Sequence, residues 1–243
     1  MNHKMIPPIS RRTGGKWYCC KKVLAHFPTT YDTYIEPFVG GGSIYFNSPK
    51  KEIEVINDLD SYLIDMYQVC KEQAFEIEAK QYTLEEYTRL KEPTPDLRTK
   101  LTNKIIVTRL SHFGIGKFDH PNRNISTSFV NKFKQHHLRL QDTMILNKDY
   151  KEIISNFDSP DSFFYLDPPY ENSNKTVRCN YTDINLEELQ QILTNIKGKF
   201  LLSLNDSERT RDLFKEFSID LIPTSYFGRK QDRKVNDLII KNY

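Results

Sequence analysis

The stretch of sequence that decides the fold is Phe163-Phe164-Tyr165-Leu166-Asp167-Pro168-Pro169-Tyr170. Its first four residues are apolar or aromatic, which is typical of a strand covered on both faces of a parallel sheet. The two prolines then end the strand, because neither can donate a backbone hydrogen bond. What remains at the end of the strand is the carboxylate of Asp167, backbone carbonyls without strand partners, and the phenol ring of Tyr170. In open α/β sheets, ligands bind at this carboxyl edge.

These end groups suit chemistry on the exocyclic amine of a nucleobase. Such an amine is a poor nucleophile, because its lone pair is delocalised into the ring. A carboxylate and a carbonyl that both accept its hydrogens can draw the nitrogen toward tetrahedral geometry, and a nearby aromatic ring can stack on the base. The sequence Asp-Pro-Pro-Tyr resembles the catalytic motif of the amino-methyltransferases, which methylate adenine N6 or cytosine N4. The alternative is a strand-ending turn with a surface aspartate and two structural prolines.

The composition shows a basic segment in a nearly neutral chain. The 243 residues suit one large domain, or one domain with a sizeable insertion, and the 12% aromatic residues are enough for a core. The net charge is +3, but residues 98–139 hold nine Lys or Arg residues and a single acid, Asp119. A concentrated basic segment indicates a partner with a phosphate backbone. The alternative, a solvated helix face, would normally carry acids among the bases.

The cysteines and the apolar runs indicate an intracellular protein without a metal site. The four cysteines, at positions 19, 20, 70 and 179, lack the spacing of zinc ligands. A reduced setting is therefore expected. The first residues lack the apolar core of a signal peptide, and no apolar run approaches the length of a membrane span.

Two glycine-rich segments near the N-terminus point to a cofactor site. The first, Arg11-Arg12-Thr13-Gly14-Gly15-Lys16, can offer backbone N–H groups and an ammonium to an anion at the start of a helix, although it lacks the P-loop spacing. In the second, a short strand at 33–37 runs into the glycine turn Glu36-Pro37-Phe38-Val39-Gly40-Gly41-Gly42-Ser43 and then into a predicted helix. A strand, a glycine turn and a helix form the cofactor-binding unit of a doubly wound sheet. The pattern is not G-x-G-x-x-G, so a dinucleotide is not favoured.

The next predicted strand, 52–56, ends in Asn57-Asp58. An acid at this place can hydrogen-bond ribose hydroxyls, and its distance from the glycine turn suits one βαβ unit. Asp58 could instead cap the following helix, and both readings can hold for different atoms. Other predicted strands are 144–146, 199–204, 217–224 and 235–241, and other predicted helices are 17–27, 97–112 and 185–196.

Taken in order, these motifs resemble those of the Dam-type DNA adenine N6-methyltransferases, which form the D12 class or alpha group. The motifs are Gly14-Gly15-Lys16, Glu36 to Gly42, Asn57-Asp58, a basic insertion, Asp149-Tyr150, Asp167 to Tyr170 and a closing strand at 236–243. Each of the five short motifs is weak singly, but together, in the family's order and with the basic insertion and the closing strand, they are strong. The resemblance implies an α/β, Rossmann-like fold of the S-adenosylmethionine-dependent methyltransferases, with a mixed, mostly parallel sheet. In it, 1–59 and 143–243 would form the catalytic domain, and 60–142 an inserted helical DNA-recognition domain.

The resemblance also implies roles for the residues of the site. No metal would be needed, because the sulfonium of S-adenosylmethionine leaves as a neutral thioether. Asp149 would accept from the adenine amine of the cofactor, although it could equally cap the helix that follows. The expected catalytic residues are Asp167, Pro168, Pro169 and Tyr170, and the expected cofactor-binding residues are Arg12, Lys16, Phe38, Gly40, Gly42, Asp58, Asp149, Tyr150 and Asp167.

The basic insertion supplies the expected DNA contacts. In the family, a hairpin in this insertion reads bases in the major groove, and the polar residues of 122–127 offer suitable donors and acceptors. The family's spacing Arg-x-Asn-x-x-Gly-x-Phe is missing here, so the target sequence, GATC included, is left open. The expected DNA-binding residues are Arg109, Lys117, Arg123, Asn124, Lys132 and Lys134.

We therefore expect a site-specific enzyme that transfers a methyl group from S-adenosylmethionine to adenine N6 in double-stranded DNA, after flipping the base out of the duplex. One alternative is a cytosine-N4 or RNA amino-methyltransferase. Another is a DNA-binding homologue without catalysis, against which the intact Asp167, Tyr170, Lys16 and Asp58 argue. We also expect a monomer in the cytoplasm of a bacterium, encoded by the cell or by a phage. A cognate restriction endonuclease in the same system is one alternative for a partner, and a solitary enzyme is the other.

Overall fold

The computed structural model describes residues 5–10, 14–111, 118, 124–169, 184–224 and 235–243. The contacts divide the chain into two compact units. The first comprises Met1–Ile64 and Asp142–Tyr243, and the second comprises Asp65–Gln141. The sequence predicted that the inserted domain would begin at residue 60 and end at residue 142.

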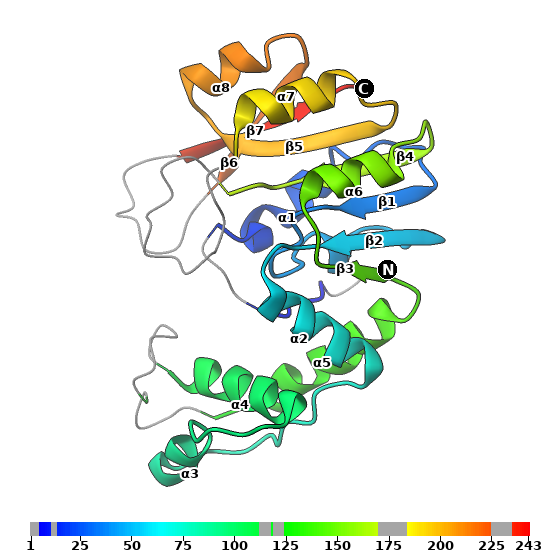
Figure 1. Cartoon of the computed structure of the whole chain (residues 1–243). Helices are drawn as coiled ribbons and strands as arrows, with labels where there is room; N and C mark the ends of the chain where they lie inside the picture. The colour runs from blue at the N-terminus through cyan, green and yellow to red at the C-terminus, as the bar shows by residue number, and fades with distance from the viewer. Residues whose placement is uncertain (1–4, 11–13, 112–117, 119–123, 170–183, 225–234) are drawn as a thin grey trace. The chain divides into compact units, whose positions relative to one another are not determined.

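The first unit is built on a seven-stranded sheet with the order β3-β2-β1-β4-β5-β7-β6 (Figure 1). Neighbours from β3 to β5 are parallel, whereas β7 is antiparallel to both β5 and β6. The strands are β1 Thr33–Glu36, β2 Ile53–Asn57, β3 Met144–Leu146, β4 Ser162–Leu166, β5 Lys199–Asn205, β6 Ser218–Thr224 and β7 Val235–Lys241. The helices are the 3-10 helices η1 Lys16–Cys19 and η2 Tyr45–Asn47, and the α-helices α1 Cys20–Leu24, α6 Tyr150–Phe157, α7 Leu186–Thr194 and α8 Glu208–Leu213. This mixed, mostly parallel sheet with its helices confirms the expected fold class.

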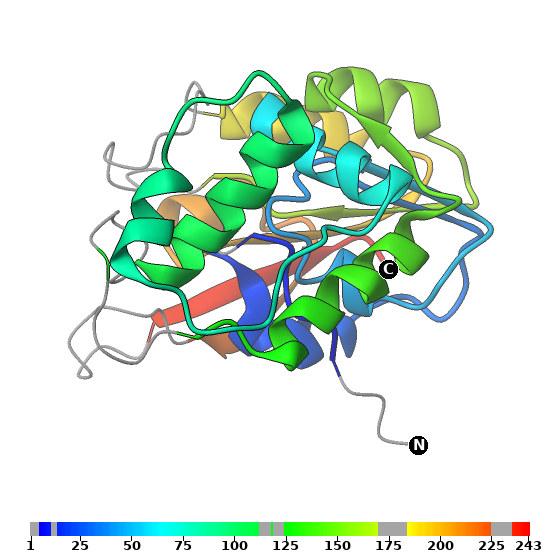
Figure 2. The same ribbon diagram turned by 90° about the horizontal axis from the view of Figure 1, so that it is seen from below.

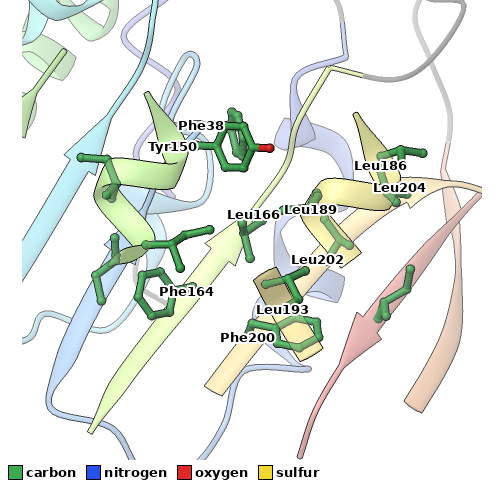
Figure 3. Packing of buried hydrophobic residues seen from close by; sticks show 14 of the residues in the cluster. Phe38, Tyr150, Phe164, Leu166, Leu186, Leu189, Leu193, Phe200, Leu202 and Leu204 are labelled. Atoms are coloured by element: carbon green, nitrogen blue, oxygen red, sulfur yellow. The ribbon is translucent and has the colours of Figure 1, made fainter. Parts of the chain in front are cut away.

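The residues of β4 alternate between two apolar layers. Phe164 and Leu166 join a core with residues of α6 and α7, as Figure 3 shows. Phe163 lies on the opposite face, where its ring centroid is 4.7 Å from that of Phe27 and 4.9 Å from that of Tyr31. Figure 2 shows α6 and α7 on one side of the sheet and α1 on the other. Because both faces are covered, all five residues of β4 are buried, as its run of apolar residues predicted.

The segment after the glycine turn corrects one prediction, since a regular helix was expected and only the three-residue η2 forms. The Asn47 side chain accepts from the Ile6 N–H at 2.9 Å and donates to the Ile6 carbonyl at 2.8 Å. The Ser48 hydroxyl donates to the Tyr45 carbonyl at 2.9 Å. Pro49 follows and cannot donate a backbone hydrogen bond to extend a helix. Side-chain contacts and a proline therefore end the helix after a single turn.

The other predicted strands of the first unit agree with the structure, whereas two predicted helices differ from it. The strand at 144–146 has the predicted bounds, and β5, β6 and β7 match their predictions to within one residue. The helix predicted for 17–27 is split into η1 and α1, and that predicted for 185–196 is the shorter α7. No described helix combines the length and the apolar character needed to span a bilayer.

The second unit is helical. Its elements are α2 Ser61–Glu72, which begins in the first unit, α3 Leu84–Arg89, α4 Leu97–Leu110 and α5 Thr127–Leu140. Helices α3, α4 and α5 start at capping side chains, since Thr83, Asp96 and Ser126 each accept a backbone N–H from the first turn. The α4 helix ends two residues before its predicted end. An isolated antiparallel bridge joins Gln81 to Asn124.

Candidate active site

The carboxylate of Asp167 lies just beyond the carboxyl end of β4 and is held by Lys16. Nζ of Lys16 donates to Oδ1 of Asp167 at 2.7 Å and lies 3.4 Å from the Gly14 carbonyl oxygen. The Lys16 side chain is 3% exposed, whereas that of Asp167 is 18% exposed. The lysine is thus a buried support, and the carboxylate is the member of the pair that a substrate can reach. Sequence reasoning missed this ion pair, because its members are 151 positions apart and neither carries a local signal for the other.

The surroundings of Asp167 make it a stronger proton acceptor than an ordinary aspartate. Burial raises the pKa of Asp167 to about 6, and the carboxylate of Asp237 adds to this effect, while Lys16 opposes it. Oδ2 of Asp237, a fully buried residue of β7, is 3.7 Å from Nζ of Lys16. With a pKa near 6, Asp167 is mostly ionised at neutral pH and can accept first a hydrogen bond and then a proton.

Asp58 ties the glycine turn to the end of β2. Its Oδ2 accepts from the N–H of Gly40 at 2.8 Å, and its Oδ1 accepts from the N–H of Asp60 at 2.9 Å. Gly40 and Gly42 have φ values of 50° and 77°, which glycine adopts without the steric cost of a side chain. Asp58 does not cap α2, because Asp60 holds that position and its Oδ1 accepts from the N–H of Tyr62 at 3.0 Å. The carboxylate of Asp58 therefore fixes the shape of the turn.

A pocket of about 250 Å³ opens where the loops after β1, β2 and β3 meet. Among the expected cofactor-binding residues, Phe38, Asp149 and Tyr150 line it. The rings of Phe38 and Tyr150 lie side by side, with centroids 5.2 Å apart (Figure 3). Asp149 is the cap of α6, since its Oδ1 accepts from the N–H of Lys151 at 2.9 Å. In the part of the chain that the structure describes, Oδ2 of Asp149 makes no hydrogen bond, so capping leaves one oxygen available to a ligand.

Tyr150 lines this pocket, and its hydroxyl oxygen is enclosed by protein without a hydrogen-bond partner among the described residues. Burial raises the pKa of Tyr150 to about 12, with smaller effects of Glu188 and Asp149 in the same direction, so the phenol stays neutral and can donate. A buried polar group without a partner calls for an explanation, such as a ligand that completes the hydrogen bond. An unmatched donor, an aromatic face and an available carboxylate oxygen together fit a polar aromatic ring such as a purine.

Asn57, which the sequence placed in the Asn57-Asp58 motif without a role of its own, is a structural support of the pocket. Its Nδ2 donates to the carbonyls of Pro37 at 3.0 Å and of Lys148 at 2.9 Å, and its Oδ1 accepts from the N–H of Lys148 at 2.8 Å. This one side chain therefore links the ends of three parallel strands. Across the pocket, Lys151 and Glu188, which were also missed, form an ion pair at 2.6 Å. Asn57 is the last residue of β2, whereas Lys151 and Glu188 lie in the first turns of α6 and α7. Only Asn57 therefore carries a local signal, its place at a strand end.

In the second unit, two expected DNA-binding residues meet at one aromatic ring. The Arg109 guanidinium carbon is 5.4 Å from the centroid of the Phe129 ring, and Nζ of Lys132 is 4.5 Å from the same centroid. Cations over aromatic faces keep their charge and gain orientation. Lys134 is exposed on the same helix as Lys132, and Asn124 is exposed at its bridge with Gln81.

The structure groups the described members of the predicted site into three sets. These are Lys16 with Asp167, Gly40 and Gly42 with Asp58, and Phe38 with Asp149 and Tyr150. Pro168 is buried and Pro169 half-buried directly after Asp167. Four expected residues lie outside the described part of the chain, namely Arg12, Lys117, Arg123 and Tyr170.

Comparison with known proteins matches residues 13–224 to the family model described as D12 class N6 adenine-specific DNA methyltransferase. The type II methyltransferase M1.LlaDCHI of Lactococcus lactis subsp. cremoris is 26% identical, over 98% of this chain and 96% of that protein. The type II methyltransferase M.CviBI of Paramecium bursaria Chlorella virus NC1A is 25% identical, over 98% of this chain and all of that protein. A DNA adenine methylase of Salmonella typhimurium is 21% identical, over 93% of this chain and 91% of that protein.

Proposed function

The chain belongs to the D12 class of N6 adenine-specific DNA methyltransferases, and we propose that Asp167 is the group that accepts the N6 hydrogens of its target adenine. The observation that carries this proposal is the geometry at the end of β4. There a partly exposed carboxylate is fixed by a 2.7 Å bond from a buried lysine and is followed by two prolines. Rigid positioning of an acceptor beside the reacting nitrogen is the main task in such a transfer.

S-adenosylmethionine is the methyl donor of this enzyme, and when bound it supplies an electrophilic methyl group on a sulfonium. The N6–carbon bond forms as the sulfur–carbon bond breaks, the sulfur leaves as a neutral thioether, and N6 must then lose one proton. Asp167 accepts a hydrogen bond from N6, which localises the lone pair on the nitrogen, and it takes the proton as positive charge develops there. Pro168 and Pro169 have no N–H, so nearby carbonyls stay outside the strand ladder and one of them can accept the second N6 hydrogen.

We assign the pocket of Phe38, Asp149 and Tyr150 to the adenine ring of the cofactor. Its volume of about 250 Å³ is below the roughly 300–1,000 Å³ of sites that take a whole ligand, which suits a single ring system. Phe38 offers the ring face, Oδ2 of Asp149 can accept from the adenine amine, and the Tyr150 hydroxyl can donate to a ring nitrogen.

The glycine turn takes the next part of the cofactor in this proposal. Carboxylate oxygens have more than one acceptor site each, so Asp58 can hold its two backbone N–H groups and still accept from a ribose hydroxyl. Gly40 and Gly42 let the backbone approach the ligand. Lys16 acts at the site by donating a hydrogen bond to Asp167. Arg12 is the remaining residue expected to contact the cofactor.

We propose that the unit Asp65–Gln141 is the DNA-recognition domain. Its basic residues Arg109, Lys132 and Lys134, with Lys117, would neutralise phosphates, which gives affinity for any duplex. Asn124 and Arg123 would contact base edges, which gives preference for one sequence. Because N6 is paired inside a duplex, the target base must be flipped out at a cost of a few kcal/mol, of which stacking on Tyr170 would return about 1–3 kcal/mol.

The family match favours adenine N6 in DNA over the cytosine-N4 and RNA alternatives, and the intact pair of Lys16 and Asp167 argues against a silent homologue.

Two relatives are type II methyltransferases, which supports a cognate restriction endonuclease as the partner, whereas the name of the third, DNA adenine methylase, implies none. Each chain carries its own Asp167 and Lys16, which suits a monomer. Light scattering would test this oligomeric state. We propose a location in the cytoplasm, where a bacterial or phage enzyme of this kind meets its DNA substrate.

Asp167→Asn tests the proposal, because the amide keeps the size of the side chain and removes its basicity. We expect methyl transfer to long unmodified duplex DNA to fall by at least about 10²–10⁴-fold, the usual worth of a general base. DNA binding should stay at the wild-type level. Asp212→Asn is the matched control, since Asp212 is 77% exposed on α8 and pairs only with Lys215 among described residues. Wild-type turnover by Asp167→Asn would show that another group accepts the proton.

A further inference from the structure

We propose that Asp237 is a positioning residue of the methyl-transfer reaction, which divides the charge of Lys16 between two carboxylates and so keeps Asp167 a good acceptor. This inference rests on the proposed role of Asp167. Asp237 sits in an otherwise apolar stretch of β7, where Leu238, Ile239 and Ile240 are all buried. A fully buried acid in such a strand is costly unless it is paired, so its presence calls for a physical reason.

The topology of the sheet explains why Asp237 lies near Asp167 and Lys16. Asp237 lies near the start of β7, in register with Asn205 at the end of β5. Since β7 is the antiparallel strand beside β5, its first residues lie at the sheet edge where β4 and β5 end. Alternation then selects the face, because Leu238 belongs to the core under α6 and α7, and Asp237 therefore points to the opposite face.

Lys16 comes to that face from η1 and meets both acids. Its Nζ is 2.7 Å from Oδ1 of Asp167 and 3.7 Å from Oδ2 of Asp237. The first distance is a hydrogen bond, and the second is an ion pair without one. Both Lys16 and Asp237 are buried, whereas Asp167 keeps 18% of its side chain accessible. The buried members thus form a charged support beneath the one group that faces a substrate.

The physical consequence concerns the basicity of Asp167. If the charge of Lys16 acted on Asp167 alone, it would stabilise the ionised carboxylate and weaken it as a proton acceptor. A second carboxylate on the same ammonium offsets that effect, and the pKa of Asp167 stays near 6, with burial as the largest cause. Cys19 of η1 also interacts electrostatically with Lys16, Asp167 and Asp237, but burial raises its pKa to about 11, so it stays neutral.

Asp237→Asn tests the inference, because the amide keeps the shape of the side chain and removes the charge. The pH profile of kcat/KM for long unmodified duplex DNA should have its acid limb near pH 6 in the wild type. Loss of the neighbouring negative charge lowers the pKa of Asp167, so the limb of Asp237→Asn should move to lower pH. Its rate above the limb should fall roughly tenfold, a fraction of the 10²–10⁴ that proton acceptance is worth. Lys16→Gln should move the limb the opposite way, to higher pH.

A direct titration makes the outcome independent of activity. The ¹³C resonance of the Asp167 carboxylate, assigned by its loss in Asp167→Asn, should titrate at lower pH in Asp237→Asn than in the wild type. Asp237→Glu keeps the charge, so it should restore the wild-type profile in part, and it serves as a second variant if Asp237→Asn folds poorly. A rate that falls equally at all pH values, with the carboxylate titration unmoved, would reduce Asp237 to a structural role. If instead Asp167→Asn keeps full activity, the proposed function fails, whatever Asp237 does.

Discussion

Replacing Tyr150 with phenylalanine should move protein stability and cofactor binding in opposite directions. The Tyr150 hydroxyl is buried without a partner among the described residues, so its removal relieves a desolvation cost of roughly 1–3 kcal/mol. The small void left by the oxygen offsets part of this gain. We expect the ligand-free enzyme to gain about 1 kcal/mol of unfolding free energy. For a chain of this length, such a gain raises Tm by about 2–4 °C.

Cofactor affinity should fall in the same variant, because the hydroxyl finds its partner only when the pocket is filled. A neutral hydrogen bond contributes about 0.5–1.5 kcal/mol. The Kd for S-adenosylhomocysteine, the product that cannot turn over, should therefore rise about two- to tenfold.

Calorimetry measures both effects, by scanning the free protein and by titration with S-adenosylhomocysteine. Tyr34→Phe is the matched control, because the Tyr34 hydroxyl donates to Oε2 of Glu36 at 2.7 Å inside the sheet. That variant should lose about 1.5–3 kcal/mol, typical of a bond to a charged group, and keep its cofactor affinity. If Tyr150→Phe lowered Tm as Tyr34→Phe does, or bound the product as tightly as the wild type, the ligand role of the hydroxyl would be refuted.

Three further predictions concern the cofactor turn and the DNA. Asp58→Ala should raise KM for S-adenosylmethionine with little change in kcat, because a ribose contact is similar in ground and transition states, and an unchanged affinity by calorimetry would contradict it. The pair Lys132→Ala and Lys134→Ala should weaken binding to all duplexes alike and lower the log–log salt slope by up to about one unit per lost phosphate contact. Uneven losses among sequences would speak against phosphate contacts. Asn124→Ala or Arg123→Ala should reduce discrimination by about 1–3 kcal/mol per base contact, which titrations with cognate and scrambled duplexes measure.

The strands of the first unit could be predicted because their signals are local. The apolar run of β4 is long enough to require cover on both faces, and the prolines after Asp167 fix where it ends. The helix expected after the glycine turn failed for a reason that is not local. The Asn47 side chain bonds to Ile6, 41 positions away, and it does so where a helix would have continued.

The candidate site could be predicted in its parts but not in its connections. Sequence motifs pointed to Asp167, Asp58 and Lys16 separately, because each follows a recognisable strand end or glycine pair. The ion pair of Lys16 with Asp167 depends on how η1 packs against the sheet, which no spacing in the sequence reports. Asp237 was assigned only to a closing strand, since its importance comes from the antiparallel pairing that carries it to the catalytic edge.

The most direct test of the central claim, transfer to adenine N6 through Asp167, is to identify the methylated nucleoside. Long unmodified duplex DNA would be incubated with the enzyme and S-adenosylmethionine carrying a deuterated methyl group, digested to nucleosides and analysed by mass spectrometry. We predict that the label appears in N6-methyldeoxyadenosine, and that Asp167→Asn leaves the DNA unlabelled. Label in N4-methyldeoxycytidine, or undiminished label with Asp167→Asn, would contradict the claim.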